Sequence, residues 1–130
     1  MTCRVLIIDD NENDLLFARL IMERLGDTFE VVEHESAKAA LAFLRDQPDH
    51  GIALILLDIN MPGMNGFEFL EAYDGLLAEQ RAHAVVVMLT SSPDPRDQAR
   101  AATFASVKGY ITKPIDKASA QGLLKLLESA

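Results

Sequence analysis

Apolar residues fall into five short runs along the chain, separated by polar and helix-forming stretches. Three runs are continuous and rich in branched aliphatic residues, namely residues 5–8, 52–57 and 84–89. Such runs are typical of strands that are covered on both faces, as in a parallel sheet. The runs at 29–32 and 109–111 are shorter and more mixed, which is usual for strands at the edge of a sheet.

Helical periodicity fills the stretches between these runs. Apolar residues three or four positions apart predict four amphipathic helices, with the stripes Leu15-Ala18-Met22-Leu25, Ala37-Ala40-Leu41-Leu44, Leu70-Tyr73-Leu77 and Ala120-Leu123-Leu124-Leu127. Gly26 is a stop signal after the first helix and Ser36 an N-cap before the second. A further alanine-rich helix is predicted over residues 97–105, where Phe104 is the one large apolar side chain.

The alternation of strand and helix sets the fold class. Five repeats of this order predict an α/β fold with a parallel sheet and right-handed crossovers. A chain of 130 residues without internal repeats or a linker fits one domain, so we expect residues 1–130 to form a single unit. At this size the chain buries roughly two-thirds of the surface that its unfolded form exposes.

Charge and composition exclude several classes of partner. The net charge of −8 repels nucleic acid and anionic lipid, so we expect neither as a partner. No apolar stretch approaches the length of a membrane span, and the N-terminus lacks a signal-peptide layout. The single cysteine, Cys3, forms no internal disulfide, which agrees with a reducing compartment. We therefore expect a cytoplasmic location.

Polar side chains follow four of the predicted strands. Asp9 and Asp10 follow the first strand, Asp58 the third, Thr90 the fourth and Lys113 the fifth. In open parallel α/β sheets, ligands bind at these carboxyl ends, near the point where the strand order reverses. We therefore expect one crevice that holds three carboxylates, a hydroxyl and an ammonium group.

Three converging carboxylates point to a bound cation. A lone Asp after a strand is usually a helix cap or a turn residue, but packed carboxylates repel and raise one another's pKa. Mg²⁺ resolves the conflict, because it takes oxygen ligands and keeps several waters. Lys113, a surface charge if considered alone, would hold a phosphate oxygen at such a crevice. The Thr90 hydroxyl would donate to an oxyanion there.

Other site types have little support in the sequence. There is no Gly-x-Gly-x-x-Gly run or P-loop for a nucleotide and no Gly-x-Ser-x-Gly nucleophile elbow. The three histidines lack the spacing of a metal site.

Four motifs together carry a resemblance to a known family. They are Ile-Ile-Asp-Asp-Asn at 7–11, Leu-Leu-Asp-Ile-Asn-Met-Pro-Gly-Met-Asn-Gly at 56–66, Leu-Thr-Ser at 89–91 and Tyr-Ile-Thr-Lys-Pro at 110–114. In this order, each at the end of a strand, they resemble the CheY-like receiver domains of two-component response regulators over essentially the whole chain. The resemblance implies a flavodoxin-like (βα)5 fold, a doubly wound five-stranded parallel sheet with strand order 2-1-3-4-5. That order is taken from the family resemblance. Receivers of this family are themselves an example of the rule that ligands bind at the carboxyl ends of parallel strands.

The resemblance also implies a role for each site residue. Asp58 would accept the phosphoryl group. Asp10 would bind Mg²⁺ directly, Asp9 chiefly through water, and Asn60 through its backbone carbonyl. Thr90 and Lys113 would contact the phosphoryl oxygens. Tyr110 would pack its ring inward in the active state, and Gly66 would ease the geometry of the loop after Asp58.

The partners follow from the same resemblance. A sensor histidine kinase or a histidine phosphotransfer protein would supply the phosphoryl group, and a downstream target protein would read the conformational change around helix 97–105, the last strand and the last helix. The chain would be a stand-alone switch or a relay intermediate, and no enzyme apart from self-catalysed transfer to, and hydrolysis from, Asp58. Both a monomer and a homodimer through the last two helices remain open. The Leu-Thr-Ser-Ser run at 89–92 is similar to phytochrome-associated response regulators.

Two features refine the comparison. Ser91 stands where the family most often has alanine, and Asn60 and Ser92 hold positions that tune dephosphorylation. The alternatives are a haloacid-dehalogenase-type phosphatase, which places a second Asp where Asn60 stands here, and a pseudo-receiver, which would lack part of the acidic, hydroxyl and lysine set.

Overall fold

The computed structural model describes residues 3–25, 29–47, 49–81, 84–91 and 93–129. The strands are β1 (Cys3–Ile8), β2 (Phe29–His34), β3 (Ile52–Asp58), β4 (Val85–Thr90) and β5 (Val107–Thr112). The helices are α1 (Glu12–Glu23), α2 (Ala37–Asp46), α3 (Gly66–Asp74), α4 (Ala78–Arg81), α5 (Pro95–Ala101) and α6 (Lys117–Ser129). None of the helices in these described ranges is long and apolar enough to cross a membrane.

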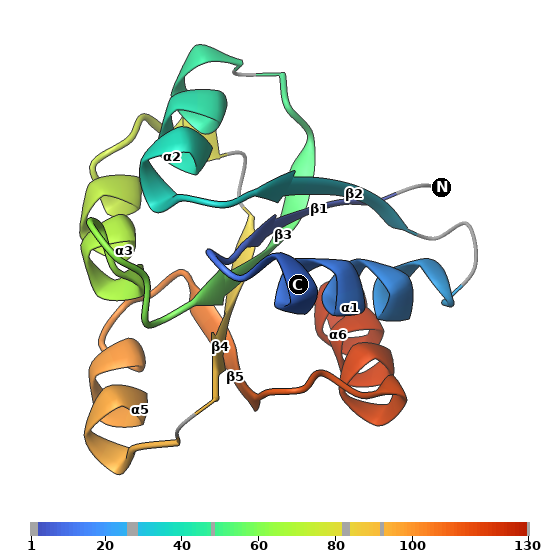
Figure 1. The fold of residues 1–130 in the computed structure, drawn as a ribbon. Helices are drawn as coiled ribbons and strands as arrows, with labels where there is room; N and C mark the ends of the chain where they lie inside the picture. Colours follow the sequence, from blue (N-terminus) through green and yellow to red (C-terminus); the bar gives the residue numbers. More distant parts are fainter. Residues whose placement is uncertain (1–2, 26–28, 48, 82–83, 92, 130) are drawn as a thin grey trace.

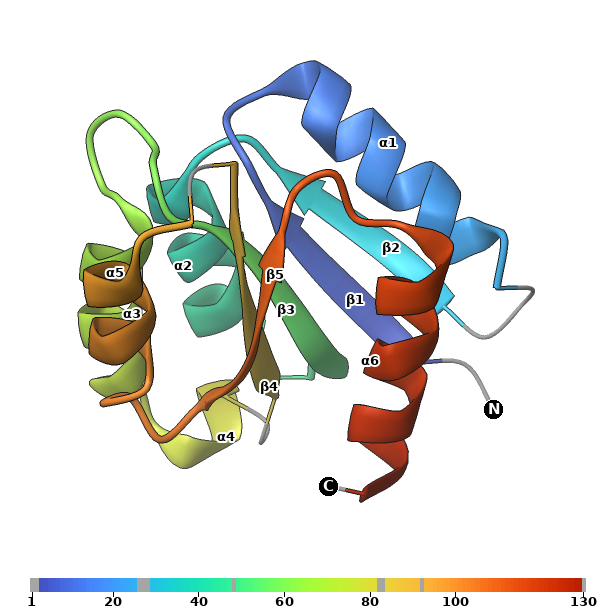
Figure 2. The same ribbon diagram turned by 90° about the horizontal axis from the view of Figure 1, so that it is seen from below.

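The five strands form one parallel sheet in the order β2-β1-β3-β4-β5. Helices α1 and α6 cover one face of the sheet, and α2, α3 and α5 cover the other (Figures 1 and 2). This confirms the doubly wound α/β fold, the strand order and the assignment of the second and fifth strands to the edges. Because β3 lies between β1 and β4, the ends of these three strands meet at one place.

Two apolar layers pack against the sheet, one on each face. Alternate residues of β1 point to opposite layers: Leu6 and Ile8 lie in the layer with α2 and α3, and Val5 and Ile7 in the layer with α1 and α6. All four side chains are fully buried. A strand that must be apolar on both sides reads as a continuous apolar run, which is why the sequence predicted the central strands well.

Side chains cap the helices that lead away from the sheet. The side-chain oxygen Oδ1 of Asn11 accepts from two backbone N–H groups at the start of α1, and Ser36 caps α2 as predicted. Asn65 and Glu68 form a capping box at α3. These caps satisfy N–H groups that have no partner within the helix. Gly26, the predicted stop after α1, lies outside the described residues.

Two helix predictions were wrong in extent. The third stripe does not continue to Leu77, which is 60% exposed, because α3 ends at Asp74 and the short helix α4 follows. The alanine-rich helix spans Pro95–Ala101 rather than residues 97–105. Pro95 suits a first helical turn, and the chain beyond Ala101 turns back so that Phe104 stacks on Phe67.

Candidate functional site

Three carboxylates meet at the carboxyl edge of the sheet. Oxygen atoms of Asp9, Asp10 and Asp58 all lie within 4.8 Å of one another. Asp9 and Asp10 follow β1, and Asp58 ends the neighbouring strand β3. Asp9 and Asp58 are buried, whereas Asp10 is exposed. The structure thus brings together the acidic residues singled out in the sequence.

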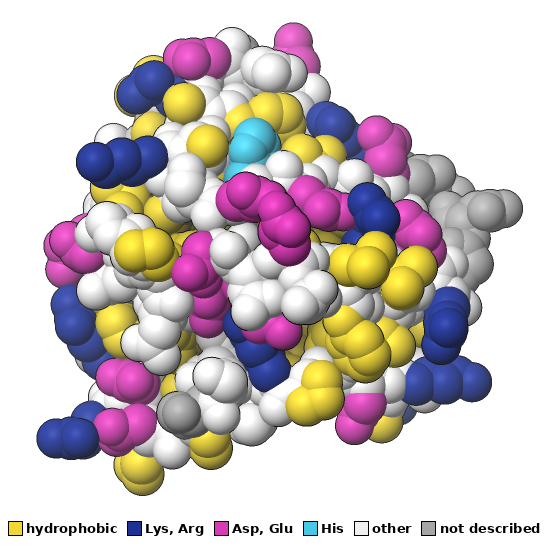
Figure 3. Space-filling model, viewed as in Figure 1, with side chains coloured by type: hydrophobic (Ala, Val, Ile, Leu, Met, Phe, Trp, Pro, Cys, Tyr) yellow, Lys and Arg dark blue, Asp and Glu magenta, His cyan; other side chains and the backbone are white. Residues whose placement is uncertain are grey.

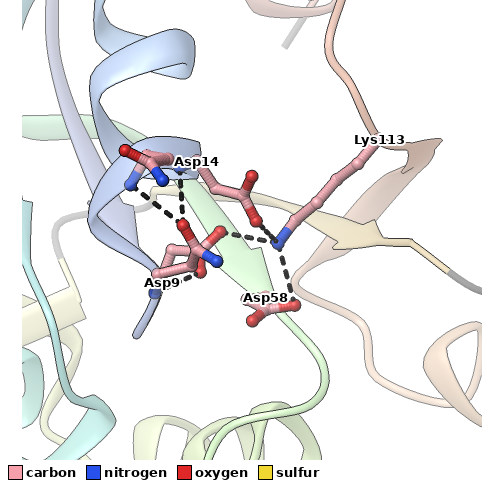
Figure 4. Close-up of polar contacts among 6 residues, drawn as sticks. Asp9, Asp14, Asp58 and Lys113 are labelled. Atoms are coloured by element: carbon pink, nitrogen blue, oxygen red, sulfur yellow. Dashed lines mark hydrogen bonds and ion pairs between the residues drawn. The ribbon is translucent and has the colours of Figure 1, made fainter.

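Lys113 reaches into the same cluster from the loop after β5. Its ammonium group donates to Asp9 Oδ2 at 2.7 Å and to Asp14 Oδ2 at 3.0 Å, and it lies 3.4 Å from Asp58 Oδ1 (Figure 4). Its backbone N–H donates to the Thr90 carbonyl at 2.7 Å, and the Lys113–Pro114 peptide bond is cis. The lysine is therefore fixed both at its backbone and at its charged end.

Asp14 belongs to the site although the sequence analysis did not select it. The signal was present, because Asn11 is a typical N-cap residue and places position 14 in the first turn of the following helix. That turn begins just beyond Asp10, at the same edge of the sheet. An acid in this turn also suits the positive end of the helix dipole, so its interaction with the dipole was enough to explain Asp14 in the sequence.

The electrostatics of the cluster favour a cation. The pKa of Asp58 is raised to about 6: burial is the largest cause, the charge of Asp9 adds to it, and Lys113 opposes both effects. Burial alone would lower the pKa of Lys113, but hydrogen bonds to Asp9 and Asp14 keep it above its usual value. Among the described residues, three carboxylates thus surround the Lys113 ammonium group, and Asp10 adds a fourth negative charge to the cluster. Oxygen donors with surplus negative charge fit a hard divalent ion such as Mg²⁺.

Backbone contacts hold Asp9 in place. Its Oδ1 accepts from the Asn11 N–H at 3.0 Å, and its Oδ2 accepts from Lys113. The side chain of Asp9 is 2% exposed. Buried charges are tolerated when they are paired and hydrogen-bonded in this way. Asp10, which is exposed, presents the face of the cluster that is open to solvent.

Thr90 and Tyr110 lie behind the acidic cluster on β4 and β5. Thr90 is fully buried at the end of β4. Tyr110 packs against the apolar layer on the α2–α3–α5 side, and its hydroxyl oxygen is enclosed. Burial raises the pKa of Tyr110. The ring is thus partly buried against this layer.

The loop after Asp58 explains Gly66. Its N–H donates to the Ile59 carbonyl at 2.9 Å, and a Cβ atom at this position would lie 2.6 Å from the Asp58 backbone carbonyl oxygen. Gly66 is thus needed for close approach, whereas Gly63, with φ of +77°, supplies the left-handed turn. Asn60 lies exposed in the same loop.

Ser91 follows Thr90 and is exposed, so the departure from the usual alanine lies at the surface of the site. Ser92, the other position linked to dephosphorylation, lies outside the described residues.

Comparison with known proteins identifies the family. The response regulator receiver domain matches residues 5–125. This chain belongs to that family. Receiver domains are in general phosphoacceptors that bind Mg²⁺ at an acidic pocket, and this chain has a cluster of three aspartates at the carboxyl edge of its sheet.

Two curated relatives show the range of proteins in which this domain occurs. The sensor protein GacS of Pseudomonas syringae pv. syringae is 31% identical over 94% of this chain, yet the match spans only 13% of GacS. Protein PilH of Pseudomonas aeruginosa is 28% identical over 97% of this chain and 95% of its own length. The receiver is thus homologous both to domains of sensor kinases and to a protein of its own size.

Solved structures agree with the fold. A two-component response regulator from Cytophaga hutchinsonii is 29% identical and superposes with a TM-score of 0.89, covering 98% of this chain and 97% of the other. The bacteriophytochrome response regulator AtBRR is 28% identical with a TM-score of 0.80, covering 98% and 94%. The chain is a CheY-like receiver, and this homology agrees with a phosphoacceptor role in two-component signalling.

Proposed function

We propose that this domain takes a phosphoryl group on Asp58 and then changes conformation to control a partner protein. One observation carries the proposal: Asp9, Asp10 and Asp58 lie within 4.8 Å of one another, with Lys113 3.4 Å from Asp58. Phosphoryl transfer depends on positioning and charge stabilisation more than on covalent chemistry. A cluster that offers an oxygen nucleophile, a cation site and an ammonium group meets those needs.

The side chains of Asp10 and Asp58 and the backbone carbonyl of Asn60 would hold Mg²⁺, with Asp9 acting chiefly through water. When bound, the ion offsets the negative charge of Asp58 and of the incoming phosphoryl group. The surplus of carboxylates over ammonium groups at this edge supports the assignment. The chain's own residues perform the remaining steps.

The donor is a phosphohistidine on a sensor histidine kinase or a histidine phosphotransfer protein. An oxygen of ionised Asp58 forms the new bond to phosphorus while the phosphorus–nitrogen bond breaks and its electron pair stays on the imidazole. Lys113 and Thr90 donate to the phosphoryl oxygens. Apart from this transfer and the later hydrolysis of its own aspartyl phosphate, the chain is not an enzyme.

Phosphorylation switches the surface formed by α5, β5 and α6. The aspartyl phosphate adds about two negative charges and new acceptor oxygens, which draw the Thr90 hydroxyl toward residue 58. Tyr110 then occupies the space beside Thr90, which biases a pre-existing equilibrium between two states. A downstream target protein, or the next carrier in a relay, reads the changed surface.

The similarity to AtBRR and the sequence at residues 89–92 favour a bacteriophytochrome kinase as the donor. A phosphotransfer screen with purified kinases separates this donor from sensor histidine kinases of the GacS kind.

Incubation with acetyl phosphate and Mg²⁺, followed by intact-mass measurement, tests the proposal. The wild-type chain should gain the mass of one phosphoryl group and Asp58→Asn none. Asp49→Asn, a change at an exposed carboxylate outside the cluster, is the matched control and should behave as wild type. Turnover of small phosphoesters would indicate a phosphatase instead. No incorporation would indicate a pseudo-receiver.

A further inference from the structure

Lys113 has a third carboxylate partner that the phosphoacceptor chemistry does not use. An ammonium group has three N–H donors, and in this structure Asp9, Asp14 and Asp58 all lie within 3.4 Å of it. Asp14 is not part of the aspartate cluster that could hold a metal. It comes from α1, whereas Lys113 comes from the loop between β5 and α6, as Figure 4 shows.

We propose that Asp14 is a positioning residue that competes with the phosphoryl group for Lys113 and thereby limits how strongly the phosphorylated state is held. The inference rests on the proposed role of Asp58. For Lys113 to direct its donors at phosphoryl oxygens, it must release one of its present partners. Asp14 is the partner that yields at the lowest cost.

The exposure of the two hydrogen-bonded acids decides which one yields. The Asp14 side chain is 43% exposed and that of Asp9 is 2% exposed. When Lys113 leaves, water can replace it at Asp14, whereas Asp9 would keep a buried charge without its cation. Asp9 is also fixed by the Asn11 N–H. The bond between Lys113 and Asp14 is therefore the one that exchanges.

The competition also affects how two elements are joined. The Asp14–Lys113 pair bridges α1 and the β5–α6 loop, and both residues line a cavity of about 270 Å³, whose other lining residues include Phe17, Ala18 and Ile115. Hydrophobic side chains are visible over α1 and α6 beside the acidic centre in Figure 3. Once Lys113 turns to the phosphoryl group, this bridge opens and the two walls of the cavity are no longer tied by an ion pair.

Beryllofluoride, a stable mimic of the phosphoryl group, provides the test. At saturating Mg²⁺ and low ionic strength, Asp14→Asn should bind it about two- to fivefold more tightly than wild type, the range expected for one partly exposed ion pair. The difference should shrink in about 1 M salt, where the screening length is about 3 Å. The ¹⁵N signal of the Lys113 ammonium should shift in the free variant and move less when beryllofluoride binds.

Glu12→Gln is the matched control, because it removes one negative charge from the same first turn of α1 without touching a partner of Lys113. It should leave the affinity and the Lys113 signal close to wild type. Equal effects of the two variants, or weaker binding by Asp14→Asn, would overturn the inference while leaving the proposed function intact. Failure of the wild-type chain both to bind beryllofluoride and to gain a phosphoryl group would refute the proposed function, and the inference with it.

Discussion

Asp58 is subject to two opposed demands. It must be ionised to attack phosphorus, yet it ends a buried strand beside another buried acid, which raises its pKa to about 6. Lys113 relieves part of this conflict at 3.4 Å. In the absence of a divalent ion the rest remains as a cost to the folded state, because the ionised carboxylate is better solvated in the unfolded chain.

Replacing Asp58 should therefore stabilise the fold. A folded pKa of about 6, above the ordinary 3.8, means that protonation favours the folded state. This contribution is complete below the unfolded pKa and is lost as the pH rises through about 6. We expect Asp58→Asn to raise the free energy of unfolding by roughly 1–3 kcal/mol at pH 8 without divalent ions, with the gain vanishing in acid. Urea unfolding at several pH values measures it.

Asp49→Asn, at an exposed position, provides the baseline for removing one negative charge. A destabilised Asp58→Asn variant, or a gain of the same size at acid and alkaline pH, would show that the carboxylate is not under strain.

Single residues also show what a sequence can and cannot reveal. Asp9, Asp58 and Lys113 could be predicted as site residues, because no single structural role explains carboxylates and a lysine that all come directly after strands. Asp14 was missed because an acid in a first helical turn is already explained by its interaction with the helix dipole. Only the fold shows that the Asp14 carboxylate in this turn lies 3.0 Å from the Lys113 ammonium group.

At the scale of elements, the start of α3 packs directly against the end of β3, where Asp58 lies. Gly66 is the first residue of α3, and its backbone lies against the backbone carbonyl group of Asp58. Its role was predicted as conformational freedom, but the structure gives close packing as the reason. The distinction matters because a side chain here would displace the residue proposed to accept phosphate.

Gly66→Ala should lower the free energy of unfolding by at least about 2 kcal/mol, since its Cβ would lie 2.6 Å from backbone oxygen. Gly122→Ala is the control: it lies within α6 with no atom within 4 Å of an added Cβ, and should stabilise by about 0.5–1 kcal/mol. Thermal and urea unfolding of both variants give the comparison. A neutral Gly66→Ala variant would contradict the packing described here.

Of the helices α2, α3 and α5, which cover the same face of the sheet, α5 has the fewest buried residues. Among its described residues only Ala101 is buried, and contacts beyond it include the Arg100 guanidinium 4.4 Å above the Phe67 ring. Its length was overestimated because alanine continues the helical pattern past residue 101, whereas the stacking of Phe104 on Phe67 is a tertiary contact that local periodicity does not contain.

Weak anchoring predicts that this region responds to phosphorylation. Amide hydrogen exchange across residues 94–117 should change when Mg²⁺ and beryllofluoride are added, because few buried apolar contacts hold α5 in place. Exchange in β1 and at the start of β3, deep in the core, serves as the internal reference and should stay constant. Identical exchange in both states across residues 94–117 would exclude this surface as the output.

At the scale of the whole molecule, the strand order creates the site. Asp9 and Asp58 are neighbours only because β1 lies beside β3, and Thr90 joins them because β4 lies on the other side of β3. The hydrophobic pattern predicted five parallel strands and two edges, but it contains no information on which central strands are adjacent. That order came from the family resemblance, and the structure confirms it.

The most direct test of the account is to locate the phosphoryl group on the chain. The chain is treated with acetyl phosphate, and borohydride then reduces the acyl phosphate, which converts a phosphorylated aspartate to homoserine. Peptide sequencing by mass spectrometry locates the homoserine. The account predicts homoserine at position 58 alone, in samples that contain Mg²⁺ and not in samples stripped of divalent ions. Homoserine at another acidic residue, or equal yields with and without the ion, would contradict it.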